Sequence, residues 1–115
     1  MANFKPDIKD VLDKLLLEIP LVRPGKMFGF PAYYVGKKLG ICLYEEGVGV
    51  KLPTASVKHL LETDKHVIPF RPYGKAVMRE WVQINLDAPK DYKKYLPIFE
   101  ESIQYLLKLE NQQME

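Results

Sequence analysis

Cysteine and histidine, the side chains most often used in nucleophilic and metal chemistry, are few and widely spaced in this sequence. The candidates are Cys42, His59 and His66, together with Glu45 and Glu46, an adjacent pair among fifteen acidic residues. A structural zinc site needs about four closely organised Cys, His or carboxylate ligands, and these residues lack that spacing. We therefore predict no metal site, and we interpret both histidines as ordinary surface residues.

Nucleophilic catalysis requires a Ser, Cys or Lys activated by a neighbouring base, and no motif for that arrangement is present. Cys42 lies between Ile41 and Leu43, a setting typical of a small buried hydrophobic side chain. None of the seven glycines has the placement that phosphate-binding loops require. Glu45 and Glu46 are interpreted as turn residues. We therefore predict no catalytic residue and no cofactor.

The stretch with the most varied chemistry is residues 70–81, where basic and aromatic side chains alternate in a loop containing proline and glycine. Such a mixture can stack nucleobases and neutralise phosphates. The alternative is structural: Phe70, Met78 and Trp81 anchor the loop in the core while its bases face water. The candidate contacts to a partner or to nucleic acid are Lys37, Lys38, Arg71, Tyr73, Lys75 and Arg79.

The charge distribution along the chain is uneven, although the formal net charge is only +2. Residues 20–79 contain ten Lys or Arg and four Asp or Glu, which gives this segment a net charge of +6. The remaining residues carry seven bases and eleven acids. Such asymmetry can steer an anionic partner toward the middle of the chain, and an ordinary solvated surface is the alternative.

The 115 residues, of which 47% are hydrophobic, suit a single domain over residues 1–115. The one cysteine cannot form an internal disulfide, and the N-terminus lacks the apolar region of a secretory signal. No apolar run approaches the roughly 20 residues that a membrane span needs. We predict a cytoplasmic domain that does not enter a membrane.

Three helices are predicted from apolar residues that recur with the helical period. The first covers residues 6–18 and begins at Pro6, which suits the first helical turn. The second has about two turns, with Thr54 as its N-cap, and ends near Thr63. The third has Pro97 in its first turn and runs to the C-terminus, with residues 110–115 expected to fray.

Between the first two helices the apolar period changes to two, as in strands. Runs at residues 27–30, 32–35, 39–44 and 48–52 indicate an antiparallel meander. Its turns use Gly36 and Gly47, because glycine reaches positive φ. Leu39, Ile41 and Leu43 are predicted to share one face of the sheet.

An edge strand over residues 66–70 and a further strand over residues 78–86 complete the predicted sheet. The elements are segregated and joined by hairpins, which favours an antiparallel arrangement. We predict a two-layer α+β fold in which a sheet of about five strands packs with helices, in the order α-β-β-β-α-β-β-α.

An ordered set of short motifs carries a family resemblance over residues 24–107. Met27-Phe28-Gly29 opens the meander, a Gly-x-Lys-Leu-Pro turn covers residues 49–53, and Pro69-Phe70 begins the basic and aromatic loop. This pattern resembles the N-terminal domain of the TfoX/Sxy competence regulators. The residues that carry the pattern are Phe28, Gly29, Pro53, Phe70, Gly74, Met78 and Trp81.

The resemblance implies the same α-β-β-β-α-β-β-α order, similar to secretion-chaperone-like domains, and a role near transcriptional regulation of DNA uptake. It implies no catalytic residue. Fuller members of that family add a C-terminal helical domain that resembles helix-hairpin-helix modules, and this sequence ends at Glu115 without one.

We therefore predict a non-enzymatic regulatory or interaction domain that binds a protein partner or itself through the sheet and residues 70–81. Direct nucleic-acid binding through the basic segment 20–79 is the first alternative. The second alternative is a small-molecule enzyme, which would require a cleft that gathers Cys42, a histidine and a carboxylate.

Overall fold

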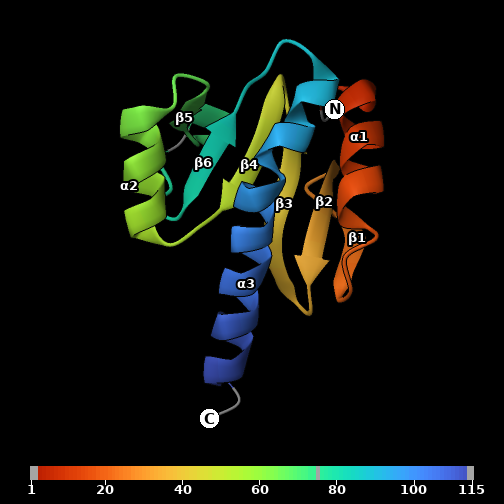
Figure 1. Ribbon diagram of the computed structural model, residues 1–115, viewed down its shortest axis with the longest axis vertical. Helices are drawn as coiled ribbons and strands as arrows, with labels where there is room; N and C mark the ends of the chain where they lie inside the picture. Colours follow the sequence, from red (N-terminus) through yellow and green to blue (C-terminus); the bar gives the residue numbers. More distant parts are fainter. Residues whose placement is uncertain (1–2, 75, 114–115) are drawn as a thin grey trace.

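One six-stranded antiparallel sheet organises the molecule, as the computed structural model of residues 3–74 and 76–113 shows (Figure 1). The strands lie in the order β1-β2-β3-β4-β6-β5, and each neighbouring pair is antiparallel. The predicted α+β class is confirmed. The elements in chain order are α1 (Pro6–Leu16), β1 (Val22–Met27), β2 (Phe30–Val35), β3 (Lys38–Tyr44), β4 (Gly47–Lys51), α2 (Thr54–Thr63), β5 (Val67–Pro69), the 3₁₀ turn η1 (Pro72–Gly74), β6 (Trp81–Ile84), the 3₁₀ segment η2 (Pro89–Tyr95) and α3 (Leu96–Gln113).

The sheet has four strands before α2, one more than the predicted order contains. We expected a strand over residues 27–30, but Phe28 and Gly29 form the two-residue turn between β1 and β2. Pro24 lies inside β1, at a position where the sequence predicts no strand. Because β1 is at the edge of the sheet, a proline there need not remove a hydrogen bond from a central ladder.

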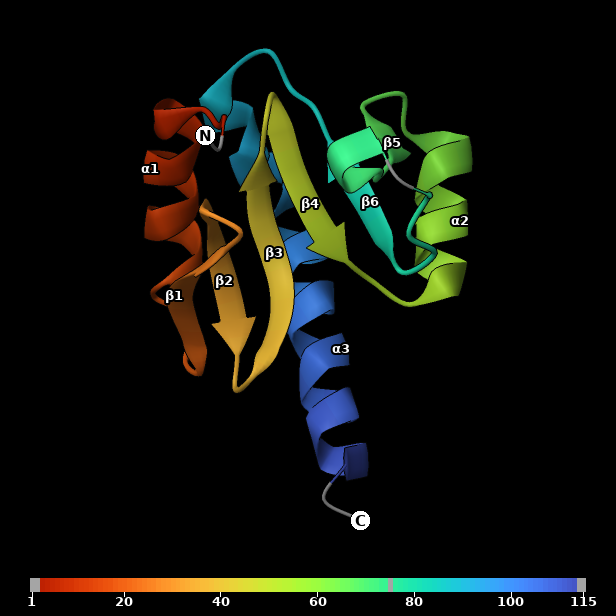
Figure 2. The same cartoon turned by 180° about the vertical axis from the view of Figure 1, so that it is seen from behind.

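The main core lies between the sheet and the helices α1 and α3, which cover the same face (Figure 1). α1 buries Ile8, Leu12 and Leu16, which recur every four residues and therefore lie on one side of the helix. Phe99 and Leu106 of α3 join the same cluster, together with alternate residues of the central strands. The opposite face of the sheet, which we call the open face, has none of these helices over it (Figure 2).

A bulge in β3 changes which side chains share a face. β2 pairs regularly with β3 except at Gly40, which is the extra residue on β3. Leu39 therefore packs with the apolar cluster of the open face, and the prediction that it lies beside Ile41 and Leu43 is wrong. Gly40 itself faces α3, where an added Cβ would meet Leu106.

The two predicted turn glycines have different roles. Gly36 has a φ of 62°, as expected for a turn residue. The prediction for Gly47 is wrong: the positive φ of that turn belongs to Glu45, at 50°. Gly47 instead provides space, because an added Cβ would meet the side chain of Asn85 and come within 2.5 Å of the carbonyl oxygen of Ile84.

The C-terminal helix is longer than the sequence indicated. We expected residues 110–115 to fray, but α3 includes residues 110–113, and residues 114–115 lie outside the described residues. The side chain of Glu110 lies against the turn between β2 and β3, so that a Cβ at Gly36 would be 2.8 Å from its carboxylate. This contact ties the last turns of α3 to the sheet. No helix among the described residues combines the length and apolar character that crossing a membrane requires.

A buried tyrosine joins α1 to the sheet through a carboxylate. The Tyr33 hydroxyl donates to Oδ1 of Asp13 at 2.6 Å, and Nζ of Lys9 donates to Oδ2 at 2.7 Å. Burial alone would raise the pKa of Asp13, but these hydrogen bonds and the Lys9 charge hold that pKa below its usual value. The ionised carboxylate is therefore favoured in the folded state, and its contribution to stability is lost as the pH falls.

Tyr33→Phe is expected to lower the free energy of unfolding at neutral pH by about 1.5–3 kcal/mol, since it removes a hydrogen bond to a charged acceptor. The difference in free energy of unfolding between the variant and the unaltered protein should have its full value above about pH 5. It should shrink as the pH falls through the lowered pKa of Asp13. Urea titrations at neutral and acidic pH measure both quantities.

The matched control for this experiment is Tyr34→Phe. The Tyr34 hydroxyl donates to the backbone carbonyl of Lys26 at 2.7 Å, which is an acceptor that does not titrate. Its effect on stability should therefore be the same at both pH values. A Tyr33→Phe deficit that is equally independent of pH would contradict the role given to Asp13.

Candidate functional site

The open face carries a second apolar cluster, and η1 lies in front of the sheet near β6 (Figure 2). Phe70 and Trp81 are buried in this cluster, as the structural interpretation of residues 70–81 predicts. The same interpretation is wrong for Met78, which is 41% exposed. The buried members of the cluster are Phe30, Ala32, Cys42, Tyr44, Phe70 and Trp81.

Aromatic rings continue from this cluster to the surface. The ring of Tyr44 lies 4.9 Å from Phe30, 5.4 Å from Phe70 and 6.0 Å from Tyr73, measured between centroids. Tyr73 in turn meets Phe28 edge to face at 6.2 Å. Phe28 is 80% exposed and Tyr73 is 55% exposed. We call Phe28 and Tyr73 the aromatic pair.

Both members of the aromatic pair have a left-handed backbone. Phe28 has a φ of 50° and is followed by Gly29 at 89°, as in a type I′ hairpin turn. Tyr73 has a φ of 58°. This conformation costs a residue with a bulky side chain roughly 1–2 kcal/mol, and turns that need it usually take Gly, Asn or Asp. The turn does not account for an aromatic residue at position 28. The ring of Tyr73 packs against Tyr44 and Phe30 of the cluster, yet it remains 55% exposed.

The backbone of Tyr73 is held by a residue of the buried cluster. Its backbone N–H donates to the buried hydroxyl of Tyr44 at 2.7 Å. Beside it lies a hollow of about 540 Å³, whose lining includes Phe30, Glu45 and Arg71. The hollow therefore offers a ligand aromatic rings, one guanidinium group and one carboxylate.

The six predicted contact residues do not form one site. Lys38 pairs with Val35, whose buried side chain belongs to the helix-covered face. Lys37 and Lys38 lie at the opposite end of β3 from Tyr44, about 20 Å away at 3.3 Å per residue. The structure places Arg71 and Tyr73 together at the hollow, Arg79 is exposed before β6, and Lys75 lies outside the described residues.

The residues proposed for an enzymatic cleft are not brought together. Cys42 is fully buried, and burial raises the pKa of its thiol to about 12, which leaves it protonated at neutral pH. His59 and His66 are both exposed. Among residues 3–74 and 76–113, no group of three His, Cys, Asp or Glu side chains could hold a metal ion.

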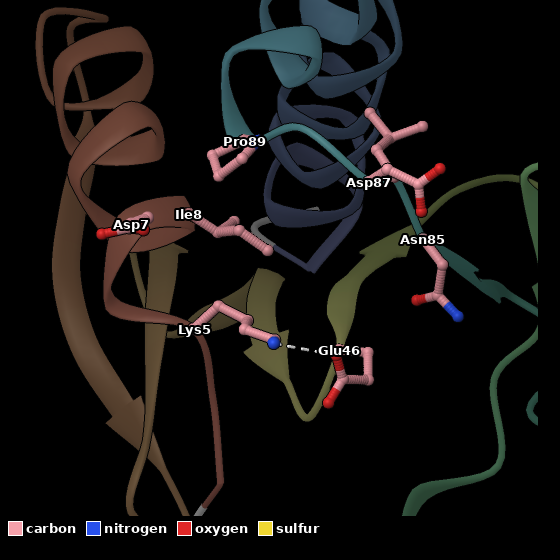
Figure 3. A pocket seen from close by; sticks show the side chains of 8 residues that line it. Lys5, Asp7, Ile8, Glu46, Asn85, Asp87 and Pro89 are labelled. Atoms are coloured by element: carbon pink, nitrogen blue, oxygen red, sulfur yellow. Dashed lines mark ion pairs between the residues drawn. The ribbon is translucent and has the colours of Figure 1, made fainter.

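A pocket of about 400 Å³ lies between the start of α1, the turn from β3 to β4, and the chain after β6 (Figure 3). Nζ of Lys5 is 3.1 Å from Oε2 of Glu46 across this pocket. The backbone N–H of Glu45 donates to the carbonyl of Asn3 at 2.7 Å. Glu45 and Glu46 lie in the turn between β3 and β4, as predicted, and these contacts also tie the N-terminal segment to that turn.

Comparison with protein-family models, curated proteins and solved structures gives no match to this chain. The resemblance to the TfoX/Sxy N-terminal domain therefore stays a prediction. Of its motif residues, Phe28 and Gly29 form the first hairpin turn, and Gly74 has a φ of 70° in η1. Pro53 is the N-cap of α2, so the prediction that Thr54 caps this helix is wrong, and Thr54 is its first helical residue.

Sequence reasoning missed the outward position of Phe28, which it treated only as a motif residue. A local signal for it exists, since two residues ending in glycine between two strand-like runs are typical of a tight hairpin turn. It also missed Arg23 and Lys51 as open-face residues. Arg23 pairs with Tyr34 and Lys51 pairs with Trp81, both of which belong to or pack against the second cluster.

Proposed function

We propose that this chain is a non-enzymatic interaction domain that binds a macromolecular partner through the open face, with the aromatic pair at the centre of the contact. The observation that carries the proposal is the exposure of Phe28 and Tyr73 on a left-handed backbone. Leu21 is also exposed and left-handed, so the strain alone does not mark a site. Two such positions whose exposed rings meet point to a functional surface. A buried cysteine and two exposed histidines offer no comparable starting point for catalysis.

The aromatic pair has the properties of a binding surface prepared in advance. Phe28 is held by a two-residue turn and Tyr73 by its bond to Tyr44, so little chain entropy is lost when a partner binds. Aromatic side chains with few rotatable bonds supply a large share of the binding energy at interfaces. Following the family resemblance, we also propose that this binding is regulatory and bears on transcription or competence.

The double variant Phe28→Asn/Tyr73→Asn is expected to abolish partner retention while leaving the domain folded. Asn tolerates the left-handed backbone, and this gain offsets the loss of the Tyr73 ring contacts with Tyr44 and Phe30, so the free energy of unfolding should change by no more than about 1 kcal/mol. The bond from residue 73 to Tyr44 uses the backbone and should persist. Retention of macromolecules from lysate, with and without nuclease treatment, measures the first effect, and urea denaturation measures the second.

Leu21→Asn is the matched control for this pull-down. Leu21 is also apolar, 64% exposed and left-handed, with a φ of 76°, but it lies before β1 and outside the aromatic cluster. Its replacement should relieve the same kind of strain without affecting retention. If the double variant retains the same macromolecules as the unaltered domain, the proposed function is wrong.

A further inference from the structure

We propose that the partner is a single-stranded nucleic acid, whose bases stack on Phe28 and Tyr73 and whose phosphates follow basic side chains along the open face. This inference rests on the proposed function and identifies its ligand. Three features of the open face carry it. They are a row of basic side chains, a hollow beside that row, and exposed aromatic rings on which a nucleobase can stack.

The basic row consists of Arg23, Lys37 and Lys51. The strand register places Arg23 beside Tyr34 and Lys51 beside Trp81, on the same side of the sheet. Lys37 lies in the turn between β2 and β3 and lines a hollow together with Arg23. Strand β1, the turn between β2 and β3, and strand β4 thus each contribute one basic side chain to the open face.

The hollow beside the basic row has a volume of about 610 Å³. A guanidinium N–H of Arg23 donates to the carbonyl of Gly36 at 2.8 Å, which orients the side chain and leaves its other N–H groups free for a ligand. An Arg and a Lys beside an aromatic ring form a suitable seat for a phosphate. The residues lining this hollow are Arg23, Pro24, Tyr34, Gly36 and Lys37.

The open face carries one more basic side chain next to the aromatic pair. Arg71 lines the hollow there, whose lining also includes Glu45. Together with Arg23, Lys37 and Lys51, Arg71 gives this face basic side chains that attract an anionic strand.

Geometry favours a single strand over a duplex. β1 joins the two parts of the surface, since Arg23 and Met27 are four residues apart, or about 13 Å along the strand. Unpaired bases can turn onto exposed rings, whereas the bases of a duplex are stacked on each other. A protein partner would use the aromatic pair equally well but would leave the basic row without a role.

Fluorescence anisotropy with labelled oligothymidine and oligouridine of about twelve nucleotides tests the inference, since this length lies within the range that one small domain covers. Both oligonucleotides are expected to bind at low salt. The logarithm of the association constant should fall with the logarithm of the salt concentration at a slope of about −2 for three phosphate contacts. Arg23→Gln should reduce that slope by about 0.7, whereas Lys58→Gln, on the exposed side of α2, should not change it.

The aromatic contribution has a different signature. Phe28→Asn/Tyr73→Asn should weaken binding of single strands about tenfold or more while leaving the salt slope unchanged. A duplex of the same length should bind more weakly than either strand and should not respond to this double variant.

The inference is overturned if neither strand binds at low salt, or if the duplex binds as tightly as the single strands and the double variant has no effect. Its failure is distinguishable from failure of the proposed function. Retention of a nuclease-resistant partner that depends on the aromatic pair, without oligonucleotide binding, would keep the function and reject the nucleic acid.

Discussion

Replacing Phe70 by alanine is expected to lower the free energy of unfolding by about 3–5 kcal/mol, because a fully buried aromatic ring is lost and a cavity remains. The ring lies 5.4 Å from Tyr44 and 5.5 Å from Trp81 between centroids. It also covers Gly49, where an added Cβ would be 3.1 Å from its edge. The strands around this ring are held by sheet pairing and can close the gap only in part, so we expect a value in the upper half of that range.

The loss has a consequence for the open face as well as for stability. Phe70 precedes η1 and supports Tyr44, which in turn holds the backbone of Tyr73. Phe70→Ala should therefore release the aromatic pair and weaken partner binding even under conditions where the domain stays folded. Urea denaturation followed by the fluorescence of Trp81, the single tryptophan, measures stability and reports on the neighbouring ring in the same experiment.

Phe99→Ala is the matched control for Phe70→Ala. Phe99 is also fully buried, but it lies on α3 in the core of the opposite face. The two variants should lose comparable stability, while only Phe70→Ala should change the native fluorescence of Trp81 and weaken binding. A stability loss below about 1 kcal/mol for Phe70→Ala would show that the loop does not depend on this ring.

The sequence predicts the helices and the sheet type well because both depend on short-range periodicity. α1 and α2 follow from repeating apolar residues, and the edge position of β5 follows from Pro69. The first strand was misplaced by several residues because Pro24 reads as a breaker, and a proline on an edge strand has no distinct local signature. The bulge at Gly40 was missed for a similar reason, since one extra residue leaves the alternating pattern on either side intact.

The candidate site is harder to predict because its parts are distant in the chain. Phe70 and Trp81 were recognised as anchors from their own segment, but the contact between Phe28 and Tyr73 joins two turns 45 residues apart. The charge count correctly shows that residues 20–79 are basic. It does not show that the strand register places their basic side chains on opposite faces of the sheet. Lys38 faces the helices, whereas Arg23 and Lys51 face the opposite way. Register decides this, and it is set by tertiary packing.

Gly47→Ala is expected to lower the free energy of unfolding by about 3 kcal/mol, the upper range for overpacking a filled site. The added methyl group would meet the side chain of Asn85 and would lie 2.5 Å from the carbonyl oxygen of Ile84. Neither can move freely: Oδ1 of Asn85 accepts a hydrogen bond from Gln83 at 3.0 Å, and Ile84 is paired within the sheet. β4 and β6 would therefore have to separate locally.

Gly74→Ala provides the comparison that separates crowding from backbone strain. Gly74 has a φ of 70°, and apart from its chain neighbours no atom of the described residues would lie within 4 Å of an added Cβ there. Its replacement should cost only the left-handed penalty of roughly 1–2 kcal/mol. Gly47 has no positive φ, so its larger cost would come from space alone. Urea denaturation of both variants decides between the two causes, because equal losses would mean that β4 and β6 adjust readily to the extra methyl group.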